Sequence, residues 1–250
     1  MLTDDRHPLR PRRRKGNAVV IGAVLGLLGF AIAGQLPLAA EAPRLVPAAL
    51  VDVPKESGLQ TAVLAGGCFW GIQGVFQHVE GVVSATAGYA GGTAETATYE
   101  QTETGLTDHS EAVRVVFDPQ TISYGTLLRI FFSAAHDPTQ LDRQGPDIGP
   151  QYRSAIFPSD DQQAKVANGY IQQLDEAKAF NAAIATTVEL GKTFYEAEDY
   201  HQDYMNNNPG QPYIAIHEQP KIEALRRFFP NLYRAQPVLV TGHGADLPDD

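Results

Sequence analysis

The stretch Thr61-Ala62-Val63-Leu64-Ala65-Gly66-Gly67-Cys68-Phe69-Trp70-Gly71 holds the only cysteine and the only tryptophan of the 250-residue chain. Residues 61–65 are short and apolar, as in a buried strand, and residues 69–79 have apolar side chains at helical spacing. The glycines between them predict a tight turn. Cys68 is therefore expected at a helix N-terminus, where the helix dipole and unpaired N–H groups favour a thiolate. A lone cysteine is most often an inert core residue, but this setting favours a nucleophile.

Periodic apolar residues predict the elements that follow this turn. Strands are expected at 81–88, 111–117, 152–157 and 187–189, and helices at 123–131 and 159–179. The order β-α-β-β-α-β predicts an α+β fold, the ferredoxin-like split β-α-β sandwich with long loop decorations. The loops at 88–108 and 136–151 indicate a function, because structureless connections of this length in a compact domain usually carry one.

The N-terminal region has the pattern of a targeting segment. A basic cluster at residues 10–15 precedes an uncharged apolar run at 18–34, as in a secretory signal or a membrane anchor. Both alternatives place the folded part outside the cytoplasm, on the periplasmic side, either exported by a signal peptide or tethered by an uncleaved anchor. The predicted organisation is a basic and signal or anchor segment at 1–34, a linker at 35–58, a folded domain at 59–234 and a disordered tail at 235–250.

Composition excludes several classes of protein. Residues 1–45 carry seven Lys and Arg against three Asp and Glu, and the rest carries 12 against 26, which leaves it with a net charge of −14. This acidic body argues against nucleic-acid binding, which needs clustered basic side chains. A single cysteine rules out an intramolecular disulfide and a CxxC redox pair.

The chemistry open to Cys68 depends on its neighbours. A thiolate can attack a carbonyl, a disulfide, a peroxide or a sulfoxide sulfur, and hydrolysis would need a histidine base. No histidine of the body is marked as such a base by its local sequence. Acidic and phenolic residues in or beside the long loops are more suggestive, namely Tyr99, Glu111, Asp147 and Tyr152. Taken singly, each also fits a structural role as a strand end, a core-edge aromatic or a turn residue.

Seven motifs in order make the chain similar to peptide methionine sulfoxide reductases of the A type, which act on the S epimer of methionine sulfoxide. The resemblance runs from about residue 61 to residue 233. The motifs are GCFWG (67–71), GYAGG (88–92), DHSEAV (108–113), HDPTQ (136–140), RQGPD (143–147), QYRS (151–154) and AEDYHQ (197–202). Enzymes of this class reverse the oxidation of methionine.

The resemblance implies a role for each candidate residue. Cys68 would attack the sulfoxide sulfur and become a sulfenic acid as methionine leaves. Glu111 would protonate the sulfoxide oxygen, which at neutral pH requires a raised pKa. Tyr99 and Tyr152 would donate hydrogen bonds to the same oxygen, and Asp147 would order water on the polar side of the pocket. The helix N-terminus should lower the pKa of Cys68 and the nearby carboxylates should raise it, and the sequence leaves that balance open.

Phe69 and Trp70 are implied to bind substrate, as an apolar wall for the S-methyl group that also suits partial positive charge on sulfur. No bound cofactor and no metal are expected. The resolving cysteines that many family members carry near the C-terminus are missing, so an external thiol such as thioredoxin, glutaredoxin or a small thiol must reduce Cys68. The expected partners are oxidised proteins or peptides, free methionine sulfoxide, this reductant and, through the N-terminal segment, a membrane. A monomer is expected.

Two other functions fit the same residues. One is a thiol peroxidase or another cysteine-based redox enzyme. The other is a membrane-tethered module that binds oxidised methionine in an aromatic pocket without turning it over.

Overall fold

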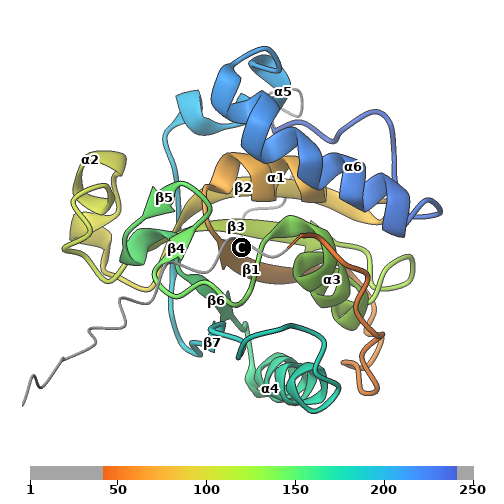
Figure 1. The fold of residues 1–250 in the computed structure, drawn as a ribbon. Helices are drawn as coiled ribbons and strands as arrows, with labels where there is room; N and C mark the ends of the chain where they lie inside the picture. Colours follow the sequence, from red (N-terminus) through yellow and green to blue (C-terminus); the bar gives the residue numbers. More distant parts are fainter. Residues whose placement is uncertain (1–41, 241–250) are drawn as a thin grey trace, which may run out of the picture. The chain divides into compact units, whose positions relative to one another are not determined.

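The structure, a computed structural model, describes residues 42–240 (Figure 1). The predicted targeting segment at 1–34 lies outside the described residues, as do residues 35–41 and 241–250. None of the helices within 42–240 is both long enough and apolar enough to cross a membrane.

A six-stranded sheet forms the centre of the domain, with the strand order β7-β6-β1-β3-β2-β8. The strands are β1 (Gln60–Gly66), β2 (Val82–Ala90), β3 (Ser110–Phe117), β6 (Ser154–Phe157), β7 (Thr187–Val188) and β8 (Phe194–Glu196). The four central strands, β6, β1, β3 and β2, are antiparallel to one another, whereas the edge strand β7 pairs parallel to β6. β3 lies between β1 and β2, and β1 lies between β3 and β6. This is the split β-α-β arrangement that the sequence predicts, and the α+β fold is confirmed.

Alternation along the strands divides the sheet into two faces. One face carries Leu64, Val113 and Val115 into the main core, against α1 (Phe69–Gln77) and α3 (Tyr124–Ile130). α3 continues into a π-helical turn, Phe131–Ala135. Both helices lie on the same side of the sheet (Figure 1). The predicted helices at 69–79 and 123–131 are therefore confirmed as the elements that cover the core.

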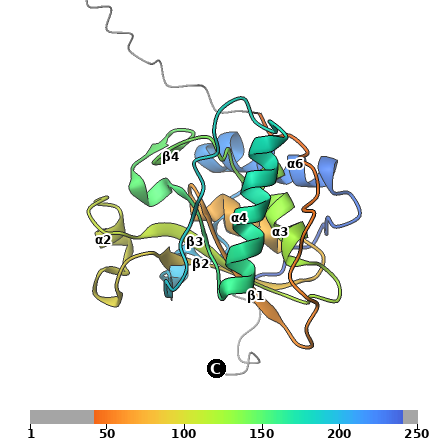
Figure 2. The same cartoon turned by 90° about the horizontal axis from the view of Figure 1, so that it is seen from below.

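The outer layers hold α4 and α6. α4 (Asp161–Glu176) packs beside α3 (Figure 2), and α6 (Gln219–Phe228) packs over α1 and the π-helical turn. α1 therefore lies between the sheet and α6, as Figure 1 shows. The opposite face of the sheet carries a small apolar cluster that includes Ala65, Ala112 and Phe157, against which Phe194 packs.

The long loops contain short elements that the sequence pattern did not indicate. The first loop contains a 3-10 turn (Ala94–Thr96) and α2 (Tyr99–Thr102), and the second contains the hairpin β4 (Arg143–Gln144) and β5 (Asp147–Ile148) and the turn Pro150–Tyr152. The C-terminal part adds the 3-10 turn Asp199–His201, α5 (Tyr204–Asn207) and the π-helical turn Ile214–Glu218. These elements are too short to show a period.

Described residues on both sides of the predicted domain at 59–234 pack against it. Residues 42–58 contain no helix or strand, as expected of a linker, but Val46 is buried and its N–H donates to Ser133 Oγ at 3.1 Å. At the other end, Val238 N donates to Gln77 O and Val240 N donates to Asp203 Oδ1, each at 3.0 Å. The described parts of the predicted linker and tail therefore pack against the domain.

Candidate active site

Close packing requires the two glycines before Cys68. A Cβ on Gly66 would lie 2.8 Å from His136 Cγ, and a Cβ on Gly67 would lie 2.5 Å from Gln144 Cβ. Gly67 also has φ +93°, a conformation that L side chains rarely adopt. The turn that the sequence predicts is therefore real, and the loop at 136–151 lies directly against it. This contact brings the second long loop to the N-terminus of α1, where Cys68 is the N-cap residue.

Gly71 has a third steric reason to be glycine. A Cβ at this position would lie 1.4 Å from Glu218 Oε2 and 3.0 Å from Lys221 Nζ. Glu218 ends the π-helical turn before α6 and is 1% exposed, and its Oε2 lies 2.7 Å from Lys221 Nζ. The C-terminal segment therefore touches the first turn of α1.

Gly71→Ala should destabilise the domain by about 2 kcal/mol, because the methyl group must displace a buried carboxylate and disturb its ion pair. The matched control is Gly169→Ala in α4, where a Cβ meets no atom within 4 Å. That control should be neutral or slightly stabilising. Urea unfolding of both variants and the wild type measures the difference. A Gly71→Ala protein as stable as the wild type would contradict the packing described above.

Glu111 is the buried acid of the site. It lies in β3 opposite Tyr89, is 3% exposed, and its Oε2 accepts a hydrogen bond from Phe69 N at 2.9 Å. Burial raises the pKa of Glu111 to about 8, with the negative charges of Glu103, Asp147 and Glu218 adding to the effect and the Phe69 N–H opposing it. At neutral pH most molecules therefore carry a protonated Glu111, which can donate a proton.

Cys68 is 7% exposed. Burial raises the pKa of this thiol well above its ordinary value, and the charges of Glu111 and Glu218 raise it further. A hydrogen bond from the Trp70 backbone N–H and the charge of Lys221 lower the pKa but do not outweigh burial. The balance that the sequence leaves open therefore favours the protonated thiol, and the predicted helix effect is present but smaller than desolvation.

The two predicted phenols lie near Glu111. Burial raises the pKa of Tyr99 to about 12, and it also raises the pKa of Tyr152 above its ordinary value; the Glu111 charge contributes in both cases. Both phenols are therefore protonated and can donate hydrogen bonds. Tyr152 OH donates to Glu103 Oε1 at 2.9 Å, and Tyr99 N donates to Glu198 Oε1 at 2.9 Å.

Asp147 closes another side of the site. It lies in β5, is half-buried, and accepts a 2.5 Å hydrogen bond from Tyr213 OH. Burial raises its pKa above the ordinary value. Tyr213, which no sequence pattern marks as a site residue, precedes the π-helical turn at 214–218 and links the C-terminal segment to the second loop through this hydrogen bond. A cavity of about 200 Å³ adjoins this hydrogen bond, lined among others by Asp147, Tyr213, Glu218 and Lys221.

The two aromatic residues after Cys68 differ in their surroundings. Trp70 is partly exposed and fixed on three sides: its Nε1 donates to His201 Nδ1 at 3.1 Å, its ring stacks on Tyr204 at 3.8 Å, and the Tyr213 ring meets it edge-on. Phe69 is 1% exposed and packs against His201 and Tyr89. Trp70 thus offers an apolar surface, whereas Phe69 lies in the core behind it.

The segment 197–203 holds these groups in place. Glu198 accepts from Tyr89 OH at 2.8 Å and from Tyr99 N, and Gln202 exchanges hydrogen bonds with the backbone of Ala87 in β2. The motif at 197–202 carries no sequence signal that predicts a role for its residues. The structure shows that they position Trp70 and Tyr99.

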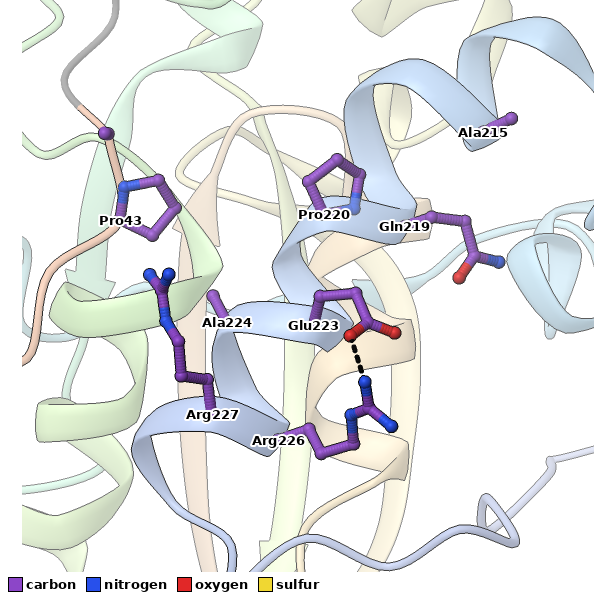
Figure 3. A pocket seen from close by; sticks show the side chains of 9 residues that line it. Pro43, Ala215, Gln219, Pro220, Glu223, Ala224, Arg226 and Arg227 are labelled. Atoms are coloured by element: carbon purple, nitrogen blue, oxygen red, sulfur yellow. Dashed lines mark hydrogen bonds and ion pairs between the residues drawn. The ribbon is translucent and has the colours of Figure 1, made fainter.

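The five predicted catalytic residues lie in one site although they come from four separate parts of the chain, with Asp147 and Tyr152 both supplied by the second loop. The charge of Glu111 influences the pKa values of Cys68, Tyr99 and Tyr152, and the charge of Asp147 influences those of Glu111 and Tyr152. A larger cavity of about 860 Å³ lies on the outer face of α6 (Figure 3). Its lining includes Pro43, Pro220 and Arg227 but none of the candidate catalytic residues.

A buried lone thiol beside a protonated carboxylic acid and two phenols defines a class of site: a single-cysteine oxidoreductase in which a sulfur nucleophile and proton donors act on one atom pair. The sequence profile of the family described as "Peptide methionine sulfoxide reductase" matches residues 60–232. The chain belongs to this family.

Individual relatives agree with the family assignment. The chain is 53% identical to peptide methionine sulfoxide reductase MsrA 2 of Mesorhizobium japonicum over 76% of this chain and 97% of the relative. It is 46% identical to MsrA 2 of Synechocystis over 84% of this chain and the full relative. Among solved structures it resembles methionine sulfoxide reductase A of Corynebacterium diphtheriae, with a TM-score of 0.52 and 35% identity over 67% of this chain and 92% of that one.

Proposed function

We propose that this enzyme reduces methionine-(S)-sulfoxide, in oxidised proteins and peptides and as the free amino acid, to methionine, and so repairs oxidative damage. The observation that carries the proposal is the buried Glu111, whose carboxyl group accepts a hydrogen bond from the first helical N–H next to Cys68. Burial raises the pKa of this group to about 8, so it can donate a proton at neutral pH. The site therefore has a nucleophile with a proton donor beside it. A sulfoxide needs both, because its sulfur is attacked while its oxygen takes a proton.

The reaction balances with these two groups. The Cys68 sulfur attacks the sulfoxide sulfur while the sulfoxide oxygen takes a proton from Glu111. The attack forms an S–S bond. The protonated oxygen then moves from the substrate sulfur to the Cys68 sulfur, so the S–O bond of the substrate and the S–S bond break, and methionine leaves with the electron pair of the S–S bond. Cys68 becomes a sulfenic acid, and Glu111 recovers a proton from the thiol. The substrate sulfur is reduced by two electrons and the cysteine sulfur is oxidised by two. Because the resting thiol is protonated, we infer that it ionises when substrate draws the proton from Glu111.

Trp70 supplies the apolar side of the substrate pocket in this proposal. Its ring is held by Tyr204 and His201, so the S-methyl group meets a rigid surface. Tyr99 and Tyr152 then orient the oxygen toward Glu111. The methyl group and the oxygen of the sulfoxide are then both held in fixed positions. Only one of the two epimers can meet both contacts and still point its sulfur toward Cys68.

Racemic methionine sulfoxide in a peptide should be consumed to one half when the enzyme and an excess of dithiothreitol are present. The remaining half should be the R epimer, because only the S epimer satisfies the aromatic and oxygen contacts together. Chiral chromatography of the reaction mixture measures this. Consumption of both epimers would overturn the pocket assignment, and consumption of hydrogen peroxide without loss of sulfoxide would favour a thiol peroxidase.

We also propose that an external thiol completes the cycle. With one cysteine in the chain, the sulfenic acid cannot form an internal disulfide. An incoming thiolate would attack the sulfenic sulfur, with loss of water and formation of a mixed disulfide, and a second thiol would release Cys68. Thioredoxin, glutaredoxin and a small thiol are the candidate donors. Steady-state rates with each of these donors at equal concentration identify the one in use, and equal failure of all three would overturn the proposal.

For location, we propose an enzyme on the periplasmic side, exported by a signal peptide or tethered by an N-terminal membrane anchor. The support is the basic cluster at 10–15 followed by the apolar run at 18–34, both outside the described residues. N-terminal mass spectrometry of the native protein separates the two alternatives. A mature chain that begins near Met1 supports the anchor, and one that begins near Pro43 supports cleavage.

A further inference from the structure

A buried ion pair from the C-terminal segment lies next to Cys68. Glu218 is 1% exposed, the side chain of Lys221 is 13% exposed, and their charged atoms are 2.7 Å apart. Burying an unpaired charge costs free energy of folding, so each of these two residues stabilises the buried charge of the other. Neither residue was singled out by the sequence pattern.

The ion pair lies on the side of α1 that faces away from the sheet. The steric limit at Gly71 shows that the Glu218 carboxylate and the Lys221 ammonium both reach the first turn of the helix. Glu111 reaches the same turn from β3 through the Phe69 N–H. The first turn of α1 begins at Cys68 and therefore packs between the sheet and the C-terminal segment (Figure 1).

We propose that Glu218 and Lys221 are positioning residues for sulfoxide reduction: their ion pair fixes the first turn of α1 and places opposed charges beside the Cys68 thiol. The role of these residues in sulfoxide reduction rests on the proposed function, but the experiment below does not depend on it. Neither side chain needs to touch substrate. Glu218 adds its charge to the burial and the Glu111 charge that keep the thiol protonated at rest, and Lys221 limits that effect so that the thiol can ionise during turnover.

The titratable groups near Cys68 come from several elements, and His136 of the second loop lies against Gly66 in the turn before it. Glu111 approaches from β3, Tyr99 from α2, and Tyr213, Glu218 and Lys221 from the C-terminal segment. The Glu218 charge raises the pKa values of Cys68, Glu111 and Asp147, whereas the Lys221 charge lowers those of Cys68 and Asp147. Removing Glu218 should therefore lower the pKa of the Cys68 thiol, and removing Lys221 should raise it.

The test is the pH dependence of Cys68 alkylation by iodoacetamide on the full chain without sulfoxide. Glu218→Gln should move the midpoint down by about half to one pH unit, and Lys221→Met should move it up by a similar amount. Near neutral pH each unit changes the alkylation rate about threefold, because a tenfold change in thiolate fraction is partly offset by altered nucleophilicity. The double variant Glu218→Gln/Lys221→Met should return close to the wild type.

A matched control lies on the same helix. Glu223 and Arg226 form an ion pair with the same three-residue spacing, but their side chains are 64% and 60% exposed and lie at the outer cavity (Figure 3). Glu223→Gln should leave the midpoint unchanged. Shifts of the same sign in both single variants, or no shift in either, would overturn the proposal by showing a purely structural role.

The experiment gives a result even if one variant does not fold. If Glu218→Gln does not fold, as its thermal melt would show, the direction of the shift in Lys221→Met alone decides the proposal. Because alkylation needs no sulfoxide, a failure here leaves sulfoxide reduction untouched. Failure of sulfoxide reduction would in turn leave the alkylation result valid.

Discussion

Cys68→Ser is expected to lose sulfoxide reduction by at least about a thousandfold, to a level below detection in a standard assay. The chain has no other thiol that could attack the sulfoxide. A serine hydroxyl is a much weaker nucleophile and cannot take up the sulfoxide oxygen as a sulfenic acid. Dithiothreitol-coupled turnover of an S-sulfoxide peptide measures the loss.

The same variant separates an enzyme from a binding module. Serine is close to cysteine in size, and the fold does not depend on a disulfide, so the thermal melt should stay near that of the wild type. Peptide binding, measured by titration calorimetry, should persist. Residual turnover above a few per cent of the wild type would contradict the role of Cys68, and a wild type that binds sulfoxide without turnover would favour the binding module.

Glu111→Gln is expected to lower kcat by a factor of about 100 to 10,000, the range typical for removal of a positioned general acid. The Gln carbonyl can still accept the Phe69 N–H, so the turn at Cys68 should be retained. In the wild type, kcat should fall as the pH rises through about 8, because Glu111 then loses the proton that it donates. The variant should lack this decline, and pH profiles of kcat for both proteins measure it.

The same substitution should make the protein more stable above pH 5. The pKa of Glu111 is raised from about 4.5 to about 8 on folding, so its contribution to stability is full below 4.5 and is lost as the pH rises toward 8. At neutral pH the lost contribution is on the order of 3 kcal/mol, which the uncharged Gln does not lose. Urea unfolding at pH 4 and pH 8 should show equal stability at the lower pH and a more stable variant at the higher one. A variant that is less stable at both would contradict a desolvated Glu111.

Much of this architecture follows from local patterns. Alternation in 111–117 and the helical period in 69–79 each come from one face packing on the core, so β3 and α1 are predicted by residues close together in sequence. The motif around Cys68 likewise predicts the turn and the helix N-terminus. Features that depend on residues close together in the sequence can therefore be predicted from it.

The rest depends on contacts between distant segments. Glu218 and Lys221 belong to a polar stretch with no signal of burial, and only the packing of α6 on α1 brings them to Gly71. The protonated state of Cys68 has a similar origin. A helix N-terminus is visible in sequence and predicts a thiolate, whereas the burial that outweighs it comes from the surrounding loops and the C-terminal segment. Segments without an apolar period can also pack on the domain, as Val46 does.

A single turnover without reductant tests the central claim most directly. Enzyme mixed with excess S-sulfoxide peptide should form one methionine per chain and then stop. Intact-mass analysis should show one added oxygen, located on Cys68 by capture with dimedone. Methionine formed without oxidation of Cys68, continued turnover without any thiol, or an intermolecular disulfide as the main product would contradict a lone cysteine that carries the oxygen and waits for an outside thiol.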